Sequence, residues 1–142
     1  MTIAAASALS ARQHILVADD SEDNRTLLCR LLTRCGYAVT EVKDGVETLK
    51  AVERDAPDLI LLDLRMPELD GEEALRELRR TYDSHVLPII IVTAEQDSNV
   101  AVDCLEAGAN DYVTKPFEWP VLRARINTYL VNRSAKHEQG PH

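Results

Sequence analysis

The chain has 142 residues, a formal net charge of −8 and a hydrophobic content of 45%, with only 4% aromatic residues. This length fits one domain, and the composition suits a core of aliphatic side chains. The negative charge argues against direct binding of nucleic acid or of anionic membrane surfaces, because both require a basic surface that pairs with phosphates. No apolar run approaches the roughly 18 residues of a membrane-spanning helix, so we expect no membrane association.

The first residues and the cysteines both favour a cytoplasmic protein. Residues 1–13 are mostly small and apolar, but they lack the basic start and the long apolar stretch of a signal peptide, so we expect a disordered N-terminal tail. The three cysteines, Cys29, Cys35 and Cys104, show no CxxC spacing and fall within apolar helical patterns. We therefore expect reduced, buried thiols rather than reactive ones.

The hydrophobic pattern predicts five strands, each followed by a helix. The expected strands cover 15–18, 38–42, 59–62, 88–93 and 112–114, and the expected helices cover 22–35, 46–54, 72–81, 98–107 and 118–131. The strands at 59–62 and 88–93 contain no polar alternation, which predicts burial on both faces of a sheet. The strand at 38–42 does alternate, which favours a position at the edge.

Particular residues mark the start of the first helix and the ends of the first and fourth helices. Asp20 or Ser21 is expected to cap the first helix, because a side-chain oxygen there accepts a hydrogen bond from a free backbone amide. Gly36 and Gly108 are expected to end the first and fourth helices, since glycine adopts the left-handed conformation found after many helix ends.

The alternation of strands and helices also predicts the fold class and the domain boundaries. It calls for an α/β fold of the flavodoxin-like (βα)5 type, which is a doubly wound parallel five-stranded sheet with helices on both faces. With 38–42 at the edge, the strand order 2-1-3-4-5 fits. We expect this domain to cover residues 14–131, followed by a polar tail or the start of a linker at 132–142.

Polar side chains stand at the ends of four of these strands. They are Asp19, Asp20, Asp63, Thr93 and Lys115. Because the C-terminal ends of parallel strands lie along one edge of a sheet, we expect these side chains to converge. Neighbouring carboxylates repel one another unless a cation lies between them, and all-oxygen ligands suit Mg²⁺. A carboxylate beside Mg²⁺, a hydroxyl and an ammonium has the groups needed to accept a phosphoryl group, which makes Asp63 the candidate nucleophile.

Each of these residue types has a simpler interpretation when it is taken alone. An acidic residue after a strand is commonly a turn or helix-capping residue. A threonine at that place commonly makes local hydrogen bonds, and a Lys-Pro pair is commonly a surface turn. The prediction of a site therefore depends on the occurrence of all of them at successive strand ends.

The same strand ends carry motifs that resemble the receiver domain of the two-component response-regulator family. The motifs are Val17-Ala18-Asp19-Asp20, Leu61-Leu62-Asp63-Leu64-Arg65-Met66-Pro67 with Asp70-Gly71, Val92-Thr93-Ala94, Gly108-Ala109-Asn110-Asp111-Tyr112 and Lys115-Pro116-Phe117. The resemblance covers about residues 14–130. It implies a phosphorylation-activated switch of a phosphorelay, which is not an enzyme beyond its own phosphoryl transfer and dephosphorylation.

The resemblance implies roles for individual residues of the site. Asp63 would accept a phosphoryl group from the phosphohistidine of a sensor histidine kinase or of a histidine phosphotransfer protein. Asp20 would bind Mg²⁺ directly, Asp19 would bind it directly or through water, and the backbone carbonyl of Arg65 would be a further ligand. Lys115 would pair with the phosphoryl oxygens.

Two further positions resemble the conformational switch of the family. Thr93 would contact the phosphoryl group and turn inward on phosphorylation, and Tyr112 would move with it between exposed and buried positions. This movement would repack the face formed by the expected helix 98–107, strand 112–114 and helix 118–131. The helix at 98–107 carries more apolar residues than one buried stripe needs, so we expect this face to contact a second copy of the chain or an output domain.

Arg65 and Glu95 occupy matching places, two residues after Asp63 and two residues after Thr93. Our hypothesis is that they form an ion pair across the mouth of the site and modulate how water reaches the acyl phosphate. The alternative is that both are solvated charges that contribute little.

Two other functions share parts of this pattern. A flavodoxin-like electron carrier has the same topology, but it needs a phosphate-binding loop rich in Ser, Thr and Gly. This chain has the acidic segment 19–23 there, which would repel a flavin phosphate. A Mg²⁺-dependent phosphatase with an aspartyl-phosphate intermediate usually has a second Asp two residues after the nucleophile, where this chain has Arg65. The sequence favours the receiver domain over both.

Overall fold

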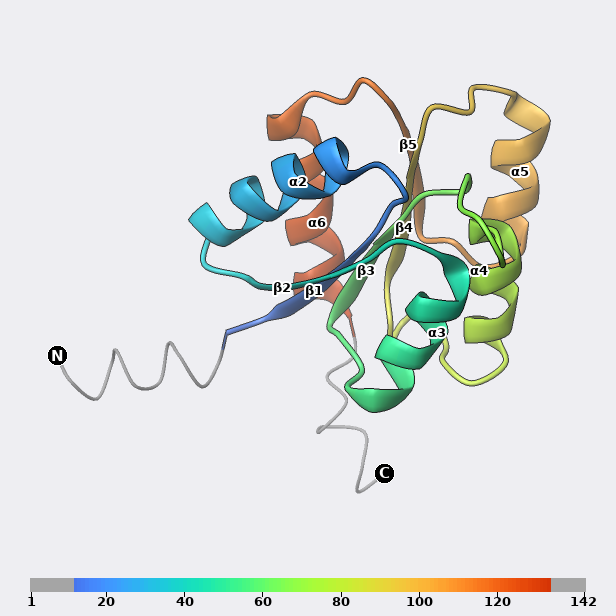
Figure 1. Ribbon diagram of the computed structural model, residues 1–142, viewed down its shortest axis with the longest axis horizontal. Coiled ribbons are helices and arrows are strands. Elements are labelled where there is room, and N and C mark those ends of the chain that lie inside the picture. The colour runs from blue at the N-terminus through green and yellow to red at the C-terminus, as the bar shows by residue number, and fades with distance from the viewer. Residues whose placement is uncertain (1–11, 134–142) are drawn as a thin grey trace, which may run out of the picture.

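The five strands form one parallel sheet in the order β2-β1-β3-β4-β5, in a computed structural model that describes residues 12–133 (Figure 1). The strands are β1 (His14–Ala18), β2 (Ala38–Val42), β3 (Leu59–Leu62), β4 (Ile89–Thr93) and β5 (Asp111–Thr114). The helices are α2 (Glu22–Arg34), α3 (Gly45–Arg54), α4 (Gly71–Arg79), α5 (Ser98–Glu106) and α6 (Trp119–Asn132). The predicted fold class and strand order are confirmed.

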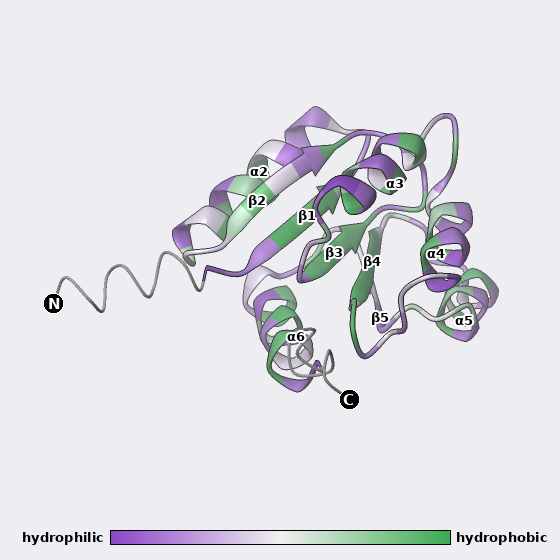
Figure 2. Cartoon of the chain, turned by 90° about the horizontal axis from the view of Figure 1, so that it is seen from below, coloured by the Kyte–Doolittle hydropathy of each residue, from purple (hydrophilic) through white to green (hydrophobic). Residues whose placement is uncertain are grey.

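Helices cover both faces of the sheet, so alternate residues of the inner strands enter two separate apolar clusters. In β3, Leu59 and Leu61 pack in one cluster with buried side chains of α2 and α6. Ile60 and Leu62 pack in the other cluster, with buried side chains of α3, α4 and α5. Figure 2 shows the inner strands as apolar. The absence of polar alternation in β3 therefore reflects burial on both faces.

The ends of the helices follow the expected capping signals. Ser21 caps α2, and its hydroxyl oxygen accepts a hydrogen bond of 3.3 Å from the amide of Asn24. Gly36 and Gly108, just beyond α2 and α5, have φ angles of 92° and 114°. Helix α4 ends two residues earlier than expected, at Arg79, because the amides of Arg80 and Thr81 bond to the carbonyls three residues before them, Glu77 and Leu78, in a tighter turn.

The last helix ends slightly later than predicted. Helix α6 continues to Asn132, one residue beyond the expected boundary. The predicted tails fall mainly on 1–11 and 134–142, which lie outside the described residues. Within residues 12–133, no helix is long and apolar enough to cross a membrane.

The prediction of three buried thiols is correct for Cys104 only. Cys104 in α5 is fully buried, whereas Cys29 in α2 and Cys35 at the C-terminal cap of α2 are partly buried. Helix α2 packs against the edge strand β2, and Cys35 lines a pocket with Trp119. Burial, together with nearby Glu41, raises the pKa of Cys29 to about 12, which opposes formation of a thiolate.

Arg79 joins the end of α4 to two loops at the N-terminal edge of the sheet. Its guanidinium donates hydrogen bonds of 2.9, 3.2 and 2.9 Å to the backbone carbonyls of Gly108, Tyr82 and Leu87. A fourth hydrogen bond of 2.9 Å goes to Oδ1 of Asn110. Burial lowers the pKa of Arg79 to about 10. Neutral oxygens thus satisfy this cation, which fixes the loop that leads into β5.

We expect Arg79→Met to lower the free energy of unfolding by about 3 kcal/mol, because it leaves several oxygen atoms in the interior without a donor. Urea denaturation followed by circular dichroism measures this loss. The matched control is Arg80→Met, since Arg80 is exposed and pairs with the partly exposed Glu77. The control should change stability by no more than about 0.5 kcal/mol. Equal losses in the two variants would contradict the role of Arg79.

Candidate functional site

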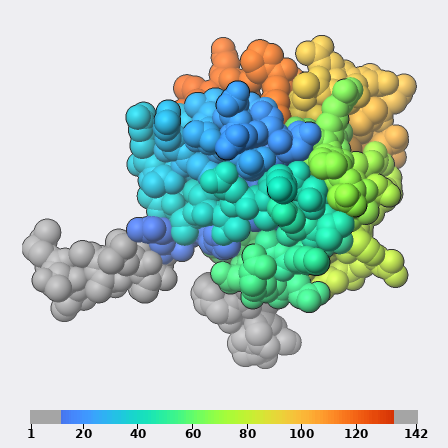
Figure 3. All heavy atoms as spheres, viewed as in Figure 1, coloured from blue at the N-terminus to red at the C-terminus, as the bar shows by residue number. Residues whose placement is uncertain are grey.

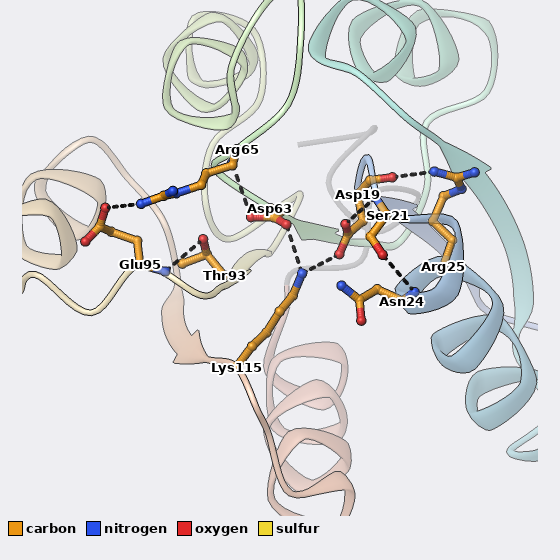
Figure 4. Close-up of polar contacts among 9 residues, drawn as sticks. All are labelled: Asp19, Ser21, Asn24, Arg25, Asp63, Arg65, Thr93, Glu95 and Lys115. Atoms are coloured by element: carbon orange, nitrogen blue, oxygen red, sulfur yellow. Dashed lines mark hydrogen bonds and ion pairs between the residues drawn. The ribbon is translucent and has the colours of Figure 1, made fainter.

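Side chains from the ends of four strands converge at the C-terminal edge of the sheet (Figure 4). Asp19 follows β1, Asp63 follows β3, Thr93 ends β4 and Lys115 follows β5. Backbone hydrogen bonds fix the ends of neighbouring strands in register. The amide of Asp63 donates to the carbonyl of Ala18 (2.9 Å), and the amide of Lys115 donates to the carbonyl of Thr93 (2.8 Å). In Figure 3 the blue start of α2 and the green segment after β3 meet at the surface, although they are far apart in the sequence.

Lys115 bridges two buried carboxylates. Its Nζ lies 2.7 Å from Oδ2 of Asp19 and 2.9 Å from Oδ2 of Asp63. The side chains of Asp19 and Asp63 are only 3% and 7% exposed, and that of Lys115 is 15% exposed. Two carboxylates so close together would repel each other, so the ammonium between them makes their burial possible.

Backbone amides orient the remaining oxygens of both carboxylates. The amide of Ser21 donates to Oδ1 of Asp19 at 2.9 Å, and the amide of Arg65 donates to Oδ1 of Asp63 at 3.2 Å. Each of these amides lies two residues after the carboxylate that it holds. Both carboxylates are therefore oriented by the fold itself.

The surroundings shift the pKa of two groups in the site. Burial raises the pKa of Asp19, against the hydrogen bonds from Lys115 and Ser21, which favour its charged form. For Lys115, burial acts to lower the pKa, but the hydrogen bonds to Asp19 and Asp63 outweigh it, and the pKa is raised. The site consequently holds Lys115 as an ammonium.

Asp19, Asp20 and Asp63 together form a set of oxygen ligands that fits a divalent cation. One carboxylate oxygen from each residue lies within 4.8 Å of the others. Asp20 is exposed while the other two are buried, so the set opens toward solvent. Mg²⁺ prefers oxygen ligands and usually keeps several of its waters, which suits three carboxylates at an open edge. The ammonium of Lys115 offsets only part of the negative charge of these three carboxylates. A divalent cation would neutralise the remainder.

Helix α4 begins directly against the backbone of Asp63. The amide of Gly71 donates to the carbonyl of Leu64 at 2.9 Å. A Cβ atom at Gly71 would overlap the carbonyl oxygen of Asp63, which no side chain can accommodate. The glycine that follows Asp70 is therefore required by this close approach, which fixes the segment that carries Asp63.

Glu95 connects the mouth of the site to Tyr112. Its Oε1 lies 3.1 Å from a terminal guanidinium nitrogen of Arg65, and its amide donates to Oγ1 of Thr93 at 3.3 Å. Its carbonyl accepts a hydrogen bond of 2.8 Å from the hydroxyl of Tyr112. The hypothesised ion pair between Arg65 and Glu95 is thus present, with side chains that are 72% and 28% exposed.

The expected switch residues and the apolar face lie next to this connection. Thr93 is fully buried and Tyr112 is partly buried, and burial raises the pKa of Tyr112 to about 12. On α5, Val102 and Leu105 are 49% and 44% exposed. The surplus of apolar residues predicted for this helix therefore does reach the surface.

Two contacts that hold Asp19 were not predicted from the sequence. Ser21 was identified only as a possible helix cap, but its amide also binds the Asp19 carboxylate. Arg25 was not singled out, yet its guanidinium donates to the backbone carbonyl of Asp19 at 2.8 Å. Nothing in the sequence distinguishes Arg25 from the other arginines of α2, because its partner is a backbone atom.

Known proteins share both the sequence and the fold. The family model of the response regulator receiver domain matches residues 15–127. Response regulator MprA of Mycobacterium leprae is 47% identical over 116 residues, which are 82% of this chain and 50% of that protein. Transcriptional regulatory protein CseB of Streptomyces avermitilis is 41% identical over 133 residues, 94% of this chain and 54% of that protein. The chain spans about half the length of these curated relatives.

A solved structure agrees with these sequence matches. The receiver domain of the sensor histidine kinase PA1611 from Pseudomonas aeruginosa superposes with a TM-score of 0.77 and 38% identity, covering 85% of this chain and 99% of that one. That domain was crystallised with a magnesium ion coordinated in its active site cleft. These matches favour neither an electron carrier nor a phosphatase. The chain belongs to the response regulator receiver domain family, and its class of function is that of a phosphorylation-activated signalling switch in a two-component system.

Proposed function

We propose that Asp63 is the residue of this switch that accepts the phosphoryl group, and that a sensor histidine kinase or a histidine phosphotransfer protein donates it. The observation that carries this proposal is the position of the Asp63 carboxylate, which is buried, oriented by the amide of Arg65 and 2.9 Å from the ammonium of Lys115. An oxygen of Asp63 forms the new bond to phosphorus while the bond from phosphorus to an imidazole nitrogen of the donor breaks. The departing nitrogen takes up a proton from solvent.

The carboxylates of Asp19, Asp20 and Asp63 would hold Mg²⁺, with the backbone carbonyl of Arg65 as a further ligand. When bound, the ion supplies positive charge that offsets the charge of the carboxylates and of the phosphoryl oxygens. The magnesium ion in the receiver domain of PA1611 supports this assignment.

Lys115 and Thr93 respond to the new charge on Asp63. Phosphorylation attaches a dianionic group to an oxygen of the Asp63 carboxylate, which lies 2.9 Å from the ammonium of Lys115, so this ammonium can pair with the phosphoryl oxygens. The hydroxyl of Thr93 now accepts a weak hydrogen bond from the amide of Glu95. Its reorientation toward the phosphoryl group breaks this bond and alters the loop between β4 and α5.

Tyr112 carries the change to the surface. Its hydroxyl is bonded to the carbonyl of Glu95, so a shift of this loop changes the position that its ring prefers. The face formed by α5, β5 and α6 then repacks, and the exposed Val102 and Leu105 lie on it. We assign this face to contact with a second copy of the chain or with an output domain.

The domain itself acts as a signalling module in the cytoplasm rather than as an enzyme on external substrates. We assign residues 14–131 to the receiver domain. The aligned segments make up 50% of MprA and 54% of CseB, and the remainder of those relatives is what suggests an output region coupled to this receiver domain. The name of CseB, a transcriptional regulatory protein, makes control of transcription one candidate for that output.

The phosphoacceptor is tested by incubation with Mg²⁺ and a small phosphodonor, followed by intact mass measurement. Wild type should gain one phosphoryl group, whereas Asp63→Asn should gain none, because an amide is a poor nucleophile. Asp103→Asn on the exposed side of α5 is the matched control and should be labelled like wild type. Equal labelling of wild type and Asp63→Asn would overturn the assignment.

The ion pair between Arg65 and Glu95 is expected to lengthen the lifetime of the acyl phosphate by covering the mouth of the site. Arg65→Ala or Glu95→Ala should shorten this lifetime by up to about fivefold, as suits an exposed pair worth up to about 1 kcal/mol. The double variant should match the single ones, because either change breaks the same pair.

Loss of the phosphoryl group over time, followed by intact mass, measures these lifetimes. The matched control is Glu72→Ala, which breaks the exposed pair of Glu72 with Arg76 on α4. Lifetimes that stay unchanged in both Arg65→Ala and Glu95→Ala would show that the pair has no such role.

A further inference from the structure

We propose that Arg25 is a positioning residue for the acidic pair Asp19 and Asp20, and that it sets the affinity of the site for Mg²⁺. The inference rests on the proposed magnesium site and adds a residue that belongs to neither the ligand set nor the switch. Arg25 lies in the second turn of α2, and Figure 4 shows its guanidinium reaching back to the end of β1.

The contacts of Arg25 run in two directions. One terminal nitrogen donates to the backbone carbonyl of Asp19 at 2.8 Å, and Nε donates to Oε1 of Glu41 at 3.3 Å. The side chain of Arg25 is only 16% exposed. A planar guanidinium presents donors in fixed directions, so these two contacts hold each other in place. Arg25 thereby ties the loop after β1 to the edge strand β2.

The carbonyl that Arg25 binds belongs to the peptide group between Asp19 and Asp20. The orientation of that peptide sets the directions in which the two carboxylates leave the backbone. Asp19 has additional restraints, because Ser21 and Lys115 hold its oxygens. Among residues 12–133, no hydrogen bond holds the exposed carboxylate of Asp20. The position of Asp20 therefore depends on the backbone, and so on Arg25.

Glu41 makes this arrangement compatible with cation binding. A bare positive charge near the ligand set would oppose Mg²⁺, but Glu41 pairs with Arg25 and offsets its charge. The strand β2 also holds the same loop directly, since the amide of Asp19 donates to the carbonyl of Val42 at 3.1 Å. Strand β2 thus supplies two anchors for the loop that carries the acidic pair.

Two effects of Arg25 have opposite signs and can be separated. If Arg25 acts only as a charge, its removal strengthens Mg²⁺ binding, and Arg25→Lys changes nothing. If it acts by position, Arg25→Met weakens binding, and Arg25→Lys restores it only in part because an ammonium lacks the planar fork. Glu41→Gln should also weaken Mg²⁺ binding, because it loosens the contact that holds Arg25 in place. The negative charge that it removes is distant from the ligand set.

The experiment is a titration with MgCl₂ at constant ionic strength, followed by backbone amide chemical shifts. We expect Arg25→Met to raise the Kd by about tenfold, as for other residues that orient metal ligands. Arg30→Met is the matched control, because Arg30 is an exposed arginine on the same helix, and its Kd should stay within about twofold of wild type. Thermal unfolding without Mg²⁺ separates a change in affinity from a loss of stability.

A Kd for Arg25→Met that equals or falls below the wild-type value would overturn the inference. If that variant does not fold, unchanged Kd values for Arg25→Lys and Glu41→Gln would overturn it as well. Absence of saturable binding by wild type would contradict the proposed magnesium site and, with it, this role of Arg25. Saturable wild-type binding with unaffected variants would leave the proposed function intact and reject only the positioning role.

Discussion

The bridge from Lys115 to the carboxylates of Asp19 and Asp63 is the interaction on which the rest of the site depends. Two buried carboxylates at this distance require a cation, and the ammonium that provides it comes from the end of β5. The bridge therefore forms only when β1, β3 and β5 end at the same edge, which the strand order 2-1-3-4-5 ensures. In the proposed function, a dianionic group on Asp63 would change this charge balance.

In the proposed switch, the route from the site to the surface passes through Glu95. This one residue contacts Arg65 at the mouth of the site, Thr93 at the end of β4 and Tyr112 in β5. The proposed control of water at the mouth and the proposed movement of the aromatic ring would thus both involve the same loop. The exposed apolar residues of α5 follow this loop in the chain, which places the proposed partner surface close to the site.

The strands, their order and the converging polar residues were predictable, because hydrophobic periodicity and the geometry of parallel sheets determine them. The pair between Arg65 and Glu95 followed from their matching offsets. The contacts of Arg25 and Gly71 with backbone atoms were not predictable, since a carbonyl gives no signal in the sequence. The partial burial of Cys29 was also missed, because helical periodicity does not show how closely the edge of a sheet is covered.

The most direct test of the account is to locate the acyl phosphate within the chain. Wild-type protein is phosphorylated with a small phosphodonor and Mg²⁺ and then treated with borohydride, which reduces an aspartyl phosphate to homoserine. Peptide mass mapping should place homoserine at residue 63 alone, with Asp19 and Asp20 unmodified. Homoserine at residue 19 or 20, or at none of the aspartates, would contradict the central role of Asp63.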